Sequence, residues 1–222
     1  MNIKGPVRTV IEEVRDIMPR SAMTLSHAYE VAEAQAARMV HLLGLDAPHV
    51  TFDALLDLPN IEVRIEPKYK MNHCAGISRF SKGRWQILVD GNDVHGRRRY
   101  TFAHELKHVL DHGLDKIAYA ELGYGDEEKQ HQHIEAICQH FAACFLMPRE
   151  WVVAWWTRGF QDVYNLAALF QVSITAMDIR LRKLGLVPAP QRDVRSYFRA
   201  ASIYPLHLRG EAGGLLASGE ST

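Results

Sequence analysis

The pentapeptide His104-Glu105-Leu106-Lys107-His108 carries two imidazoles and a carboxylate within little more than one helical turn. Residues four apart lie on one face of a helix, about 5–6 Å apart at Cβ, so the two histidines can bind one metal ion. The glutamate then faces a water molecule on that ion, as in zinc-dependent hydrolases. The stretch therefore predicts a metal-binding helix in a hydrolase.

The residues around this motif favour a half-buried helix. Apolar side chains recur at helical intervals, at Phe102, Leu106, Val109 and Leu110. Imidazoles and a carboxylate on a half-buried face need partners, and a metal ion satisfies them more completely than packing does. The alternative interpretation is an exposed helix whose histidines are incidental.

A third metal ligand must come from elsewhere in the chain. The metzincin pattern would need glycine at position 111 and histidine at position 114, where the chain has Asp111 and Leu114, so that class is excluded. His112 continues the row after His108, but one straight helix cannot wrap three turns around an ion at about 2.0–2.1 Å. We therefore place His112 at the surface or beside a ligand.

Glu135 leads the remaining candidates, ahead of His131 and His133 at the start of the same predicted helix. An apolar stripe runs along this helix through Ile134, Cys138, Phe141, Ala142 and Phe145. Glu135 adjoins the stripe, and an acid at the edge of a buried face is rare unless it is paired or coordinated. The two histidines stay open as alternatives.

Two segments, read in order, resemble the ImmA/IrrE family of metallopeptidases. They are residues 97–108 (RRRYTFAHELKH) and residues 135–148 (EAICQHFAACFLMP), and the resemblance extends over residues 25–187. The site that it implies has one Zn²⁺ per chain, His104, His108 and Glu135 as zinc ligands, and Glu105 as the catalytic residue. Family members cut helix-turn-helix repressors, so the resemblance implies an endopeptidase with such a protein substrate.

The chain departs from the family pattern at three positions. Cys138 and Gln139 stand where the family usually has alanine and asparagine, and Lys107 stands where glycine is common. Gln139 keeps an amide one turn from Glu135, so it could orient a ligand from behind. The candidates for stabilising the oxyanion of peptide hydrolysis are Tyr119, Tyr124, His131 and His133.

Hydrophobic periodicity predicts an α+β fold with a zincin-like core. Helical spacing covers residues 7–17 and 25–43, a short helix runs from Thr51 to Pro59, and strands cover residues 61–65, 75–80 and 85–89. We expect a small antiparallel sheet before the motif helix, with one edge strand able to hydrogen-bond an extended peptide. Residues 114–130 are expected to form a loop, and Arg97–Arg99 a strand end or solvated turn.

A C-terminal helical element is predicted after the zincin core. Residues 166–181 resemble a helix-turn-helix, with Ser173 as the cap of its second helix. The expected division is an N-terminal helix (1–22), a zincin-like domain (23–150), the helical element (151–187) and a weakly ordered tail (188–222). Lys plus Arg equals Asp plus Glu at 26 each, which argues against direct DNA binding through residues 166–184.

Composition bounds the remaining possibilities. With 222 residues and 47% hydrophobic content, the chain can form one compact core, and it has no apolar run of membrane-spanning length. The start lacks the uninterrupted apolar stretch of a secretory signal, and the three cysteines form no C-x-x-C pair. We expect a cytoplasmic protein with reduced thiols. The sequence does not specify its oligomeric state.

Two other functions remain open from the sequence. One is a non-catalytic protein that uses the zincin scaffold to hold a regulator or toxin, and the other is a DNA-binding regulator acting through residues 166–184. The intact Glu105 favours the enzyme over the scaffold.

Overall fold

A computed structural model describes residues 9–46, 48–51, 58 and 60–188. Two helices come first, α1 (Val10–Arg15) and α2 (Leu25–Leu42). A capping box begins α1, because the Thr9 side chain accepts from the Glu12 amide while Glu12 accepts from the Thr9 amide. The short helix expected from Thr51 to Pro59 lies almost wholly outside the described residues, as does the tail predicted from residue 188.

Three strands form the sheet: β1 (Ile61–Glu66), β2 (Gly76–Ser81) and β3 (Arg84–Asp90), in the order β1-β3-β2. β2 and β3 pair antiparallel across a tight turn in which Lys82 and Gly83 have positive φ. β1 and β3 pair parallel, so the sheet is mixed and the expectation of a wholly antiparallel sheet was wrong. Alternation locates each strand but carries no direction, and the connection through the 3-10 helix η1 (Lys68–Met71) sets the direction of β1.

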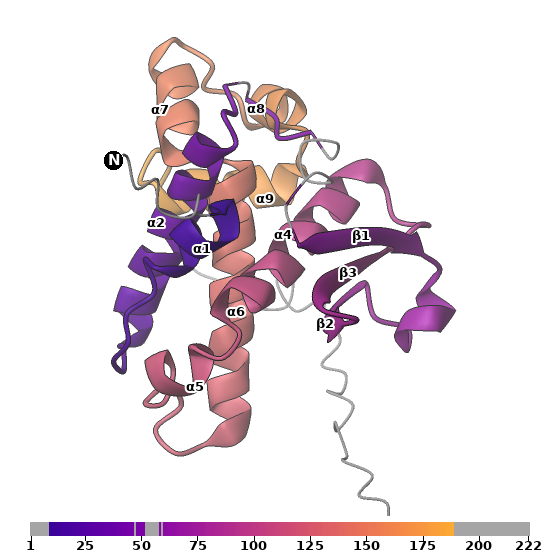
Figure 1. Ribbon diagram of the computed structural model, residues 1–222. Helices are drawn as coiled ribbons and strands as arrows, with labels where there is room; N and C mark the ends of the chain where they lie inside the picture. The colour runs from indigo at the N-terminus through magenta and orange to yellow at the C-terminus, as the bar shows by residue number, and fades with distance from the viewer. Residues whose placement is uncertain (1–8, 47, 52–57, 59, 189–222) are drawn as a thin grey trace, which may run out of the picture. The chain divides into compact units, whose positions relative to one another are not determined.

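The central helix α4 (His95–Asp111) packs against β2 and β3 on one side and against α6 (Glu127–Leu146) on the other (Figure 1). α6 in turn packs against α2. Apolar side chains from α1, α2, the sheet, α4 and α6 form one continuous core. The α+β class expected from the sequence is confirmed.

Two local predictions were wrong. Arg97–Arg99 lie inside α4 rather than in a strand end or turn, because the helix begins about nine residues before the motif. Residues 114–130 are not one loop: α5 (Asp115–Ala118) occupies part of them, and α6 begins at Glu127 with Asp126 as its cap. The glycines at positions 123 and 125 suggested a longer irregular segment than the chain forms.

Three helices follow α6: α7 (Arg149–Thr157), α8 (Val163–Phe170) and α9 (Ile174–Lys183). Ser173 caps α9 as predicted, since its hydroxyl accepts from the Ala176 amide. These helices share a second hydrophobic cluster that includes Met147.

Two buried arginines join this C-terminal region to the rest of the fold. Arg99 of α4 donates to the carbonyls of Phe170 and Gln171 at the end of α8. Arg180 of α9 donates to the carbonyl of Met147 and pairs with Glu33 of α2 at 2.8 Å. The helix-turn-helix-like segment is therefore packed onto the core through Arg99 of α4 and through its own Arg180.

Among the described helices, none combines the length and the apolarity needed to cross a membrane.

Candidate metal centre

Helix α4 brings His104 and His108 together on one face. Because they are four residues apart, their rings lie side by side with centroids 5.1 Å apart, and their Nε2 atoms are 3.3 Å apart. His104 is 3% exposed, whereas His108 is half-buried. The two ring nitrogens therefore point to the same place at the edge of the core.

Helix α6 brings Glu135 to the same place. Its Oε2 lies 3.2 Å from Nε2 of His104, and its Oε1 lies 3.3 Å from Nε2 of His108. Each carboxylate oxygen thus faces one imidazole, and one donor atom from each of the three residues lies within 4.8 Å of the other two. The packing of α4 against α6 brings Glu135 to the two histidines.

The spacing of the donor residues suits a tetrahedral zinc site. Zinc binds histidine nitrogen and carboxylate oxygen at about 2.0–2.1 Å, which places neighbouring donors about 3.3–3.4 Å apart in a tetrahedron. The two Nε2 atoms, 3.3 Å apart, match this spacing, and a Glu135 oxygen lies 3.2–3.3 Å from each of them. The residues present therefore fit a zinc ion, with a fourth position left for water or substrate.

Electrostatics at the three donors also favour a cation. Burial raises the pKa of Glu135, but the contacts with His104 and His108 lower it by more than burial raises it. The pKa of Glu135 therefore lies well below its usual range. Burial lowers the pKa of His108, whereas the nearby Cys138, Glu135 and Glu105 raise it well above its usual range. Two carboxylates beside an imidazole, those of Glu135 and Glu105, are a setting in which a bound metal replaces a proton.

Glu105 points from α4 towards the edge strand β2. At Gly76, the first residue of β2, an added Cβ would lie 2.4 Å from Cγ2 of Thr101 and 3.1 Å from Cγ of Glu105. Only glycine lets the strand approach the helix this closely. The Glu105 carboxylate is therefore held beside the strand and within electrostatic range of His108.

Cys138, rather than Gln139, contacts a donor residue. The Cys138 thiol lies 3.7 Å from Nδ1 of His108, on the side of the ring away from Glu135. Within the described residues, the Gln139 side chain forms no hydrogen bond to a donor, and its backbone carbonyl accepts from Tyr100. Burial raises the pKa of the Cys138 thiol, so it packs there as a neutral group.

The four candidates for the oxyanion have different surroundings. Tyr119 is buried and its hydroxyl donates to Asp111 at 2.7 Å, which removes it from the site. Tyr124 is 93% exposed. His133 lies about 200° around α6 from Glu135, so it faces away, whereas His131 is half-buried one turn before Glu135 on the same face. Of the two histidines, only His131 shares the α6 face of Glu135.

His112, expected to be no ligand, ends α4 and is exposed. Its ring packs edge-on against Trp85 with centroids 4.9 Å apart, and its carbonyl accepts from Arg15.

A second group of metal-binding residue types, Glu33, His140 and Cys144, lies between α2 and α6. The Arg180 guanidinium already binds both Glu33 and Cys144, and Lys183 lies 3.4 Å from His140. Two cations inside the group oppose a metal ion, and together with burial they lower the pKa of His140 to about 4. This cluster anchors α9 rather than offering a second centre.

The sequence matches peptidase family M78, described as the IrrE N-terminal-like domain, over residues 59–182. The chain belongs to this metallopeptidase family. The match takes in more than half of the chain and includes all three donors and Glu105. Among curated proteins, none matches this M78 chain.

One solved structure shows the fold of this M78 chain in another protein. It is a Mycobacterium tuberculosis transcriptional regulator, with a TM-score of 0.55 and 20% identity over 79% of this chain. The match covers 52% of that protein, so the chain spans about half of its length. At this identity the likeness concerns the fold.

Lys107, the residue that replaces the family's glycine, is fully buried behind the motif of this M78 chain. Its ammonium group donates to Asp111, to Gln35 of α2 at 2.7 Å and to the Tyr119 hydroxyl. The sequence did not predict this network, because Gln35 and Tyr119 show no regular spacing from Lys107. Among its members, only Lys107 and Asp111 are one helical turn from each other. Their spacing of four was the one available signal.

Replacing Lys107 by methionine should destabilise the fold by about 3–5 kcal/mol, since Asp111 would remain buried without its cation. The measurement is urea unfolding of the zinc-free protein. The double variant Lys107→Met/Asp111→Asn should recover part of the loss, because it removes both charges. Equal losses in the single and double variants would show that packing, not the ion pair, matters at this position.

Proposed function

We propose that the protein is a zinc-dependent endopeptidase that hydrolyses a peptide bond in a specific regulatory protein. The observation that carries this proposal is the convergence of His104, His108 and Glu135, with Glu105 on the same helix as the two histidines and beside strand β2. Family membership supports the peptidase class. We assign one zinc ion per chain to His104, His108 and Glu135.

The residues of the site divide the chemistry between them. Zinc held there would polarise the peptide carbonyl and lower the pKa of bound water towards about 7. Glu105 removes the water proton as general base and then passes it to the leaving amine as general acid. Cys138 fixes the ring of His108, and His131 is the nearest candidate to donate to the developing oxyanion.

The proposed substrate is a helix-turn-helix transcriptional repressor. The ImmA/IrrE resemblance motivates this choice, and the edge strand β2 beside Glu105 supports it, because an extended segment of a substrate can pair with such a strand. We place the protein in the cytoplasm, where the thiols of Cys74, Cys138 and Cys144 stay reduced.

The structure gives little support to the two alternatives, a non-catalytic binding scaffold and a DNA-binding regulator. A scaffold that only holds a partner has no need for Glu105 next to three residues that can bind a metal ion. A DNA-binding role for α9 would need free cations, but Arg180 is buried against Glu33 and Arg182 pairs with Asp178 at 2.9 Å. A mobility-shift assay at two salt concentrations would detect such binding.

The test is cleavage of the repressor encoded beside the gene. Zinc-loaded protein should yield two product masses, a chelator should abolish them, and added zinc should restore them, since zinc completes the site. The chelated protein should keep its far-UV circular dichroism, which controls for unfolding. Cleavage that survives complete removal of metal would contradict the proposal.

A further inference from the structure

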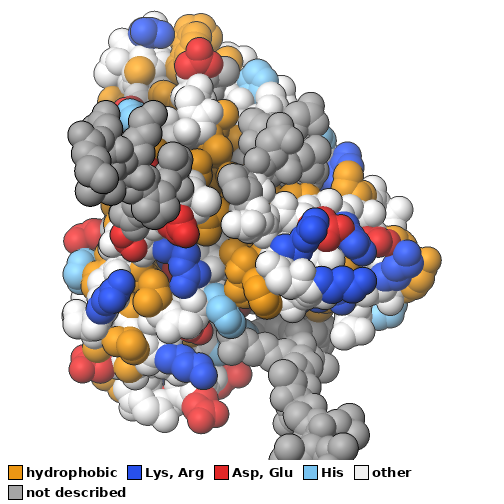
Figure 2. All heavy atoms as spheres, viewed as in Figure 1, with side chains coloured by type: hydrophobic (Ala, Val, Ile, Leu, Met, Phe, Trp, Pro, Cys, Tyr) orange, Lys and Arg blue, Asp and Glu red, His pale blue; other side chains and the backbone are white. Residues whose placement is uncertain are grey.

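The end of the β2–β3 hairpin concentrates positive charge in a chain of no net charge. Residues 75–89 contain no Asp or Glu, and the exposed cations there are Arg79, Lys82 and Arg84. Figure 2 shows several blue Lys and Arg side chains over the region that holds the sheet, with fewer red Asp and Glu side chains among them. The hairpin end therefore carries a local field that the whole-chain balance conceals.

Two of these cations are uncommitted. Arg79 donates to Gln86, and on the neighbouring strand Arg64 pairs with Glu62 at 2.6 Å. Within the described part of the chain, Lys82 and Arg84 form no direct hydrogen bond or ion pair, and Arg84 acts on Glu62 only through space. An acidic partner can therefore bind them without breaking an existing contact.

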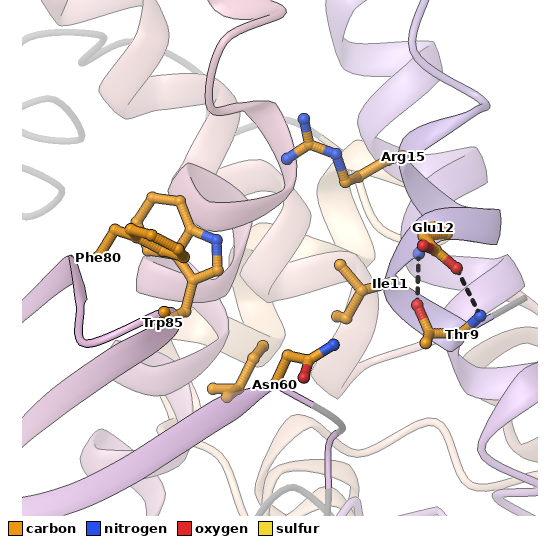
Figure 3. A pocket seen from close by; sticks show the side chains of 9 residues that line it. Thr9, Ile11, Glu12, Arg15, Asn60, Phe80 and Trp85 are labelled. Atoms are coloured by element: carbon orange, nitrogen blue, oxygen red, sulfur yellow. Dashed lines mark hydrogen bonds between the residues drawn. The ribbon is translucent and has the colours of Figure 1, made fainter.

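A pocket of about 340 Å³ lies between this hairpin and α1 (Figure 3). Three of its polar residues already have partners: Thr9 and Glu12 cap α1, and Arg15 donates to the carbonyls of Val109 and His112. The apolar part of its wall is formed by Ile11, Ile61, Phe80 and Trp85. The pocket suits one apolar side chain.

An aromatic pair stands at the mouth of the pocket. Phe80 is 61% exposed, and its ring meets that of Trp85 edge-to-face with centroids 5.4 Å apart. A large exposed ring beside free cations marks a contact surface rather than a solvated turn. Phe80 lies on the edge strand β2, where an extended peptide can pair with the backbone, which favours a peptide as the partner.

Strand β2 links this surface to the candidate metal centre. It begins at Gly76 beside Glu105 and ends at the hairpin, and it is an edge strand of the described sheet. At about 3.3–3.4 Å per residue, Phe80 lies about 13 Å along the strand from Gly76, and Lys82 follows in the turn directly after the strand ends at Ser81. A peptide paired with β2 would therefore reach the hairpin four to six residues from the bond at Glu105.

We propose that the hairpin site, defined by Phe80, Lys82, Arg84 and Trp85, binds an acidic segment of the substrate and takes one apolar side chain into the pocket. The segment lies four to six residues from the scissile bond. That placement rests on the proposed peptidase function, whereas the binding preference does not. The site selects substrates by charge at a distance from the reacting atoms.

Binding is tested with full-length protein carrying Glu105→Gln, so that no probe is cut. The probe is a fluorescein-labelled peptide with a central leucine flanked by Asp and Glu, compared by anisotropy with the same peptide carrying Asn and Gln. The acidic peptide should bind about tenfold more tightly at low salt, as two exposed ion pairs allow. Lys82→Gln/Arg84→Gln should remove this preference.

Three controls make the result specific. Arg149→Gln/Arg158→Gln, which neutralises two exposed cations on α7 and its end, should keep the preference. Phe80→Ala should weaken the binding of both peptides about equally at any salt concentration, since it removes an apolar contact. A single-stranded DNA oligonucleotide should bind more weakly than the acidic peptide.

Equal binding of the two peptides, or equal loss in the α7 variant, would overturn the inference. Tighter binding of the oligonucleotide at Lys82 and Arg84 would also overturn it and identify a nucleic-acid surface. If acidic peptides bind here but the wild-type protein cuts no protein, the proposed function is contradicted and the hairpin site is still supported. If the protein cuts its substrate without any preference for acidic segments, the proposed function is supported and the hairpin site is contradicted.

Discussion

Replacing Glu105 by glutamine is expected to reduce peptide hydrolysis by about 10²–10⁴-fold, the contribution of a positioned general base and acid. The amide is nearly the same size as the carboxylate, so the approach of β2 at Gly76 should be preserved. The variant should still bind one zinc ion, since Glu105 is not among the three donors. The measurements are turnover of the cleaved repressor and metal content by mass spectrometry.

A control separates this effect from a general loss of charge. Glu150→Gln changes an exposed glutamate on α7 and should leave both turnover and metal content unchanged. If the Glu105 variant cut at the wild-type rate with zinc bound, the assignment of general base would be refuted. If it lost zinc, Glu105 would instead have to be placed among the ligands.

Much of the site could be predicted from the sequence because its key spacing is local. His104 and His108 are four apart on a helix, and the helical period alone sets their rings side by side. Glu135 was suggested by its place beside an apolar stripe and by the family resemblance, and the structure brings it to within 3.3 Å of both rings. The assignment of these residues as zinc ligands stays a prediction.

The features that escaped prediction depend on contacts between distant segments. The direction of β1 follows from the path of residues 67–75, which has no periodic signal. The basic triplet looked solvated, yet Arg99 is buried because the end of α8 presents carbonyls to it. Cys138 looked like a defect in the motif, but its neutral thiol packs against the ring of His108.

Replacing Glu135 by alanine should weaken zinc binding by more than about 100-fold, because changes behind the ligands alone cost about 10–100-fold. Two imidazoles on one helix would remain, and they cannot complete a closed site. Hydrolysis should fall in parallel and should return in part at high zinc concentration, which distinguishes lost metal from a lost base. The measurement is competition for zinc with a chromophoric chelator.

The matched control is Glu127→Ala, an exposed acid in the first turn of the same helix. It should lower helix stability slightly through the loss of a favourable charge at the N-terminus, while zinc affinity stays at the wild-type level. Unchanged affinity in Glu135→Ala, together with loss of affinity in a His131→Ala variant, would move the third ligand to His131. Because Glu135 touches both imidazoles and His131 lies a full turn away, we expect the opposite result.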